Sequence, residues 1–119
     1  MRGPRLALRG RRAVFDALEI SLETMTALTE PLAVIRAEDS DLFRQLRRAA
    51  RSVPLNIAEG ARRSGLDRKH HWRIAAGSAD EVRTGLRVAV ACAELDADVA
   101  AASMTLLDRV IAMLWKMTH

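Results

Sequence analysis

The chain has 119 residues, of which 50% are hydrophobic and 29% are charged, so it holds enough apolar material for one domain and is too short for a second. Lysine and arginine number 19 against 15 acidic residues, for a formal net charge of +4, and 17 of the 19 are arginine. This excess of arginine is compatible with an anionic partner such as nucleic acid or an acidic protein, and equally with the base composition of the coding sequence. A single cysteine, Cys92, excludes an intramolecular disulfide and a thiolate metal cluster within one chain, and we expect it to be a small residue inside a helix.

The N-terminal part of the sequence predicts an arm followed by a helix. Residues 1–10 contain glycine and proline among arginines, which is typical of a flexible basic arm, either a disordered tail or a nucleic-acid-binding segment. Apolar residues then recur three and four positions apart from Arg11 to about Thr29, which predicts a first helix. It should stop before Pro31, because the residue preceding a proline avoids the α region, and residues 31–39 are predicted to be a connection.

The second helix carries most of the arginine. We expect it to begin at the capping candidates Asp39-Ser40-Asp41 and to end near Gly65, which suits a C-terminal cap. At about 100° per residue its wheel separates an apolar face from a basic face. The basic face consists of Arg44, Arg47, Arg48, Arg51 and Arg62. Pro54 lies inside this helix, where it removes one backbone hydrogen bond and should bend the axis at a cost of about 3 kcal/mol.

Two further helices follow. The third is expected over residues 67–94 with Asp67 as its N-terminal cap, and its inward face is poor in large side chains. Gly77 and Gly85 each weaken a helix by about 1 kcal/mol relative to alanine, so we expect both to mark close approaches between helices. The fourth helix is predicted over residues 99–117.

These elements predict an all-α protein. Four helices with mostly short connections favour an up-down-up-down four-helix bundle with a kinked second helix over residues 11–119. No run of apolar residues is long enough to span a membrane, and no signal-type segment is present, so we expect a cytoplasmic protein without a membrane partner.

Two segments of the sequence carry a recognisable motif. Ser52–Gly60, reading SVPLNIAEG, is followed by Arg62-Arg63 and later by residues 74–82, reading IAAGSADEV, and this pattern resembles the bacterial four-helix bundle proteins of the 23S rRNA intervening-sequence type. The family has no established enzymatic activity. The resemblance implies an architectural role for a motif made of Ser52, Pro54, Asn56, Glu59, Gly60 and Arg63.

The resemblance also extends to the accessory variability proteins of diversity-generating retroelements. It implies a homopentamer with the surfaces of the second and third predicted helices at or near the subunit contacts. The partners that it implies are RNA or DNA and a reverse transcriptase.

Residue types that carry enzyme chemistry are sparse. No Glu-x-x-His pair is present, and the adjacent His70 and His71 point about 100° apart, so we predict neither a metal site nor a cofactor. Glu59 is a candidate acid or base, but its spacing to Arg63 gives it an ordinary i, i+4 ion pair. Together with Ser52 and Asn56, these two residues line up at spacings of four, three and four and form the best candidate for a polar network. We therefore expect a protein that is not an enzyme.

The basic face of the second helix is the remaining functional signal. From Arg44 to Arg62 it spans about 27 Å at a rise of 1.5 Å per residue, which is comparable with several phosphate steps of a duplex. The row is compatible with a solvated surface, a subunit interface or a nucleic-acid contact. We favour an oligomeric accessory protein that contacts RNA or DNA backbone through this face, and the alternative is a protein-interaction scaffold that never touches nucleic acid.

Overall fold

The computed structural model describes residues 4–119, with side chains from residue 9 onward, and every regular element in this range is an α-helix. The helices are α1 (Pro4–Ala27), α2 (Thr29–Glu38), α3 (Ser40–Ala61), α4 (Gly65–Ala91) and α5 (Ala97–Thr118). The all-α prediction is confirmed, whereas the expected number of four helices is corrected to five among the described residues. In this part of the chain no helix combines the length and the apolar composition needed to cross a membrane.

The additional helix is α2, in the segment predicted to be a connection. Pro31 has no N–H to offer the carbonyl of Ala27, which explains why α1 ends at that residue. The chain nevertheless keeps a helical path, because Leu28 N–H bonds to Thr24 O and Leu32 N–H bonds to Leu28 O, each at 2.9 Å. In the first turn of α2 the missing donor costs little, since the N–H groups there lack an intrahelical partner in any case.

The first helix begins at Pro4 and not at Arg11, so the predicted start is wrong. Proline suits the first helical position because its fixed φ matches the helix and its missing N–H is not needed there. Gly10 weakens the helix by about 1 kcal/mol without ending it. Residues 1–3 of the predicted arm lie outside the described residues.

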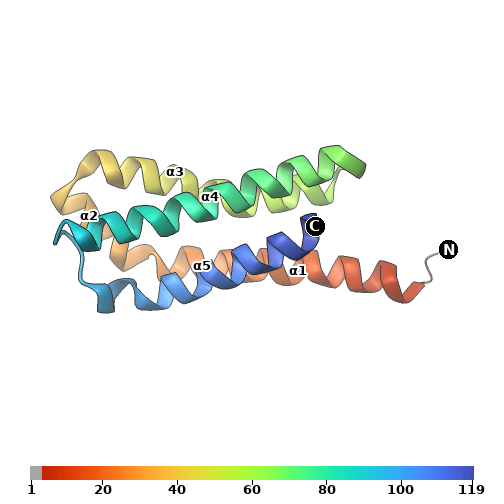
Figure 1. Cartoon of the computed structure of the whole chain (residues 1–119), viewed down its shortest axis with the longest axis horizontal. Helices are drawn as coiled ribbons and strands as arrows, with labels where there is room; N and C mark the ends of the chain where they lie inside the picture. The colour runs from red at the N-terminus through yellow and green to blue at the C-terminus, as the bar shows by residue number, and fades with distance from the viewer. Residues whose placement is uncertain (1–3) are drawn as a thin grey trace.

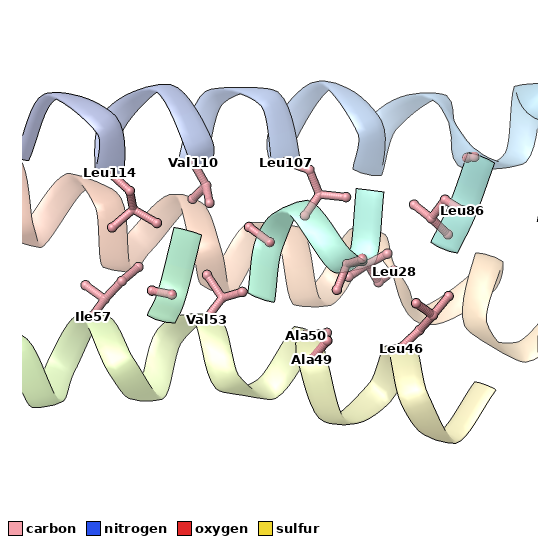
Figure 2. Close-up of a cluster of buried hydrophobic side chains, with 14 of the residues drawn as sticks. Leu28, Leu46, Ala49, Ala50, Val53, Ile57, Leu86, Leu107, Val110 and Leu114 are labelled. Carbon is pink, nitrogen blue, oxygen red and sulfur yellow. The ribbon is translucent and has the colours of Figure 1, made fainter. Parts of the chain in front are cut away.

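The four long helices lie side by side in an elongated bundle that measures 54 × 23 × 20 Å (Figure 1). Around the bundle, α3 packs on α4, α4 on α5, α5 on α1, and α1 on α3, while the short α2 packs mainly on α3 at one end. Side chains of α3 point across the interior toward Leu107, Val110 and Leu114 of α5 (Figure 2). The fully buried large residues of this core are Leu28, Ile35, Leu46, Ile57, Val82, Leu86, Leu107, Val110 and Leu114.

One of the two glycines predicted to mark a close approach does so. A Cβ built on Gly85 of α4 would lie 2.2 Å from Leu46 Cδ2 of α3, so the absent side chain makes room for a buried leucine. Gly77 is exposed and a Cβ there would meet nothing within 4 Å, so that prediction is wrong. The two positions differ because Gly85 faces α3 and Gly77 faces solvent.

The helix ends follow local chemistry. Asp39 caps α3 as predicted, since its side chain accepts a hydrogen bond from Leu42 N–H at 3.0 Å. Asp67 is not the cap of α4; that position belongs to Ser64, and the left-handed backbone at Gly65, with φ +59°, opens the helix. At the other end of α4, Cys92 is exposed at the C-terminal cap, which corrects the expectation of a residue inside the helix.

Candidate nucleic-acid interface

The basic face of α3 lies opposite its buried stripe. Leu46, Ala49, Ala50, Val53 and Ile57 point into the core, and this fixes the rotation of the helix. Arg44, Arg47, Arg48 and Arg51 are all exposed on the other face, as the 3.6-residue period predicted. Arg62 is exposed too, but it is the C-terminal cap of α3 and lies just beyond the helix.

The five arginines are not electrostatically equal. Arg44 pairs with Asp41 one turn earlier, and Arg62 lies 3.3 Å from Glu59 Oε2. By contrast, none of Arg47, Arg48 and Arg51 has a carboxylate oxygen within 4.0 Å among the described residues. These three guanidinium groups are the unneutralised part of the face.

A shallow groove runs along α3 at this point. It is lined by Arg44, Arg47, Arg48, Arg51, Ser52, Leu55 and Asn56. All of these residues belong to α3, and Leu55 is 68% exposed among them. Arg62 does not line the groove, so the structure brings together four of the five predicted arginines and leaves the fifth at the C-terminal cap of the helix.

A polar cluster joins α3 to α4 beside this groove. Asn56 Nδ2 donates to Ser52 Oγ and to Ser52 O, both at 3.0 Å. Two side chains of α4 complete the cluster: Ser78 Oγ donates to Ser52 Oγ at 2.8 Å, and His71 Nδ1 donates to Asn56 Oδ1 at 3.1 Å. Ser52 and Asn56 of the predicted network are therefore bonded to each other, and the cluster that they form bridges two helices. Sequence reasoning missed Ser78 and His71 as its members.

Glu59 and Arg63, the other two residues of the predicted network, form an ion pair. Arg63 lies 3.6 Å from Glu59 Oε2 and donates to Asp67 Oδ2 at 2.9 Å, across the turn between α3 and α4. The hydrogen bond to Asp67, followed by the charges of Asp67 and Glu59, raises the pKa of the Arg63 guanidinium above its ordinary value. Glu59 is thus held between two cations, Arg62 and Arg63, which gives it a structural role.

Gly60 permits a tight contact at the end of α3. A Cβ at this residue would lie 2.4 Å from Trp72 Nε1, and that indole N–H donates to Ile57 O at 3.2 Å. Arg68 stacks over the Trp72 ring, 5.5 Å from its centroid, and donates to Gly60 O at 3.1 Å, which satisfies a carbonyl at the helix end. Pro54 lies inside α3, which continues through it, and a bend there stays a prediction.

The arrangement suits binding to an anion more than the movement of protons. Within residues 9–119, no three His, Cys, Asp or Glu side chains are grouped for a metal ion. Arg83 is committed to holding α4 against α5, because it donates to Asp108 at 2.8 Å and to Asp80 at 2.7 Å. The hydrogen bond to Asp108, followed by that to Asp80, raises the pKa of Arg83. Arg47, Arg48 and Arg51 have no such carboxylate partner among the described residues, so their guanidinium groups remain available to an external anion.

Comparison with known proteins adds one finding to this geometry. The family model described as 23S rRNA-intervening sequence protein matches residues 14–116, from near the middle of α1 almost to the end of α5. No curated protein matches the chain.

Proposed function

Because the chain belongs to the 23S rRNA-intervening sequence protein family, we propose that it is a non-enzymatic accessory protein that binds the phosphate backbone of RNA or DNA through the basic face of α3. Arginine forms bidentate contacts with phosphate, and a row of such groups binds a duplex without reading its sequence. A homo-oligomer, for which the family resemblance implies five copies, would multiply the charge presented to nucleic acid and stays a prediction.

One observation carries the proposal. Arg47, Arg48 and Arg51 lie on one exposed face of a single helix without a carboxylate within 4.0 Å, while Arg44, Arg62, Arg63 and Arg83 are all paired. Exposed arginines without a carboxylate partner occur on other helices as well, and what distinguishes these three is that they lie within five consecutive residues on one face of a helix. The unpaired guanidinium groups retain their full capacity for an external anion.

The test replaces these residues together by Arg47→Gln, Arg48→Gln and Arg51→Gln. Binding of random-sequence duplex RNA and duplex DNA is measured by fluorescence anisotropy between 50 and 200 mM salt. Loss of about three phosphate contacts should flatten the slope of log K against log salt concentration by about 2.7 for a B-DNA duplex. Such a slope difference corresponds to about a 40-fold change in affinity over this salt range.

A matched variant separates this face from net charge. Arg73, Arg87 and Arg109 are also exposed and lack a carboxylate within 4.0 Å among the described residues, so changing all three to glutamine removes the same charge from other helices. We expect the control to bind with nearly the wild-type slope. An equal loss of affinity in both variants would show that binding depends on net charge and not on this face. If the wild-type protein binds neither duplex RNA nor duplex DNA, the protein-interaction scaffold becomes the better hypothesis.

A further inference from the structure

The C-terminal end of α5 carries an aromatic side chain that the core does not use. Trp115 is 59% exposed, whereas Trp72, the other tryptophan of the chain, is buried and donates its indole N–H to Ile57 O. The ring of Trp115 stacks on that of His119, with the centroids 4.3 Å apart and an angle of 8° between the planes. Because His119 covers one face of the indole, this exposure leaves the opposite face open to solvent.

The surroundings of Trp115 follow from the way in which α4 and α5 pack. The two helices run antiparallel (Figure 1), and Arg83 of α4 donates to Asp108 of α5 at 2.8 Å and to Asp80 at 2.7 Å. Seven residues along a helix return to the same face, two turns away. Two turns from this ionic contact, toward the C-terminal end of α5, Trp115 therefore takes the place of Asp108, and Arg73 takes the place of Asp80.

The charge beside this part of the α4–α5 seam is positive. No acidic residue follows Asp108 in α5, and Lys116 is the neighbour of Trp115 in the chain. From α4, Arg73 lies along the seam and Lys69 lies one turn before it. These three cations are exposed, and none of them has a carboxylate oxygen within 4.0 Å in the part of the chain that the structure describes. An open aromatic face is thus flanked by unneutralised cations.

We propose that this surface binds a single strand of nucleic acid, with one base stacked on the open face of Trp115 and neighbouring phosphates on the three cations. Every base has a π-face, and aromatic side chains beside cations bind single strands without reading their sequence. His119 supports the indole from behind, so little freedom of the side chain is lost when a base stacks on its front. In a duplex the bases are stacked on one another, so this surface selects unpaired strands.

This surface and the basic face of α3 lie on different helices and bind different forms of the polymer. The groove on α3 is lined by arginine, serine, leucine and asparagine, without an aromatic side chain on which a base could stack. The variant with Arg47→Gln, Arg48→Gln and Arg51→Gln should therefore lose duplex binding and keep the stacking of a single strand on Trp115. Trp115→Ala should show the reverse, so the failure of one proposal is distinguishable from the failure of the other.

Tryptophan fluorescence reads the contact directly. A base stacked on Trp115 should quench its emission, whereas Trp72 is buried and should not respond. The probes are single strands of about eight deoxythymidines or about eight uridines, within the usual site size. An abasic phosphodiester of equal length has the same charge and no base. Both oligonucleotides should quench the emission, and the abasic strand should leave it unchanged.

Substitutions separate stacking from attraction by charge. Trp115→Ala should lower the affinity for a labelled oligonucleotide about 5- to 150-fold, which is the effect of losing one stacked base. Trp115→Phe should keep most of the affinity while the quenching disappears. Arg73→Gln should reduce the slope of log K against log salt concentration by about 0.7, the value of one phosphate contact on a single strand. Phe15→Ala is the matched control, because it removes a side chain of similar exposure, 61%, from α1.

Three results would overturn the proposal. Equal quenching by the abasic strand would show that the anion alone is recognised. An unchanged affinity of Trp115→Ala would remove the role of the indole, and an equal loss in Phe15→Ala would show that any exposed aromatic residue has the same effect. Circular dichroism should show unchanged helix content in every variant, since all the altered side chains are exposed.

Discussion

Replacing Gly60 by alanine tests whether the contact between α3 and Trp72 holds the two helices together. The new Cβ would lie 2.4 Å from Trp72 Nε1 and 3.1 Å from the carbonyl oxygen of Arg68. Trp72 is only 7% exposed, so the indole can retreat only by giving up its hydrogen bond to Ile57 O. Overpacking costs about 1–3 kcal/mol and an unpaired buried N–H costs about 1–3 kcal/mol, whereas helix propensity returns about 1 kcal/mol. We expect a net loss of about 3 kcal/mol from these values.

Urea denaturation followed by circular dichroism measures this loss, provided that the slope m is the same for the variants compared. Gly77→Ala is the matched control, because a Cβ there meets nothing within 4 Å and should add up to about 1 kcal/mol. If Gly60→Ala stabilises the protein as Gly77→Ala does, the steric argument is wrong. Trp72→Phe offers a second check, since the smaller ring should reduce the cost of Gly60→Ala in the double variant.

Two other substitutions follow from backbone geometry and from the polar cluster. Ala93 has the left-handed φ of +57°, and the backbone there is held because Ala93 N–H donates to Val90 O at 3.0 Å and Glu94 N–H donates to Ala89 O at 2.9 Å. Ala93→Gly should relieve the left-handed strain and stabilise the protein by about 1 kcal/mol in thermal unfolding. A lower melting temperature would contradict this. Asn56→Ala should cost about 1–3 kcal/mol because it leaves His71 Nδ1 without its acceptor and removes one of the two hydrogen bonds to Ser52 Oγ. Gln45→Ala, which removes only an exposed 3.3 Å bond between the same helices, should cost less than about 0.5 kcal/mol, and equal losses would contradict a special role of the cluster.

Periodicity predicted the long helices because each of them buries one stripe of apolar residues. The wrong predictions concern prolines in the first turn of a helix and residues whose surroundings depend on how the helices pack and where they end. Pro31 and Pro4 were interpreted as ends of structure, yet both lie in the first turn of a helix, where a missing N–H is tolerated. Gly77 and Gly85 have the same local cost, and only the packing of α3 against α4 decides which of them faces Leu46. Cys92 likewise looked internal among alanines until the position of the helix end was known.

The candidate site was predictable to the extent that it belongs to one helix. Arg47, Arg48 and Arg51 follow from the wheel of α3 alone. The partners of Ser52 and Asn56 do not, because Ser78 and His71 reach them only in the register that α3 and α4 adopt. Arg62 and Glu59 are three residues apart, a spacing at which an ion pair can form but does not have to form.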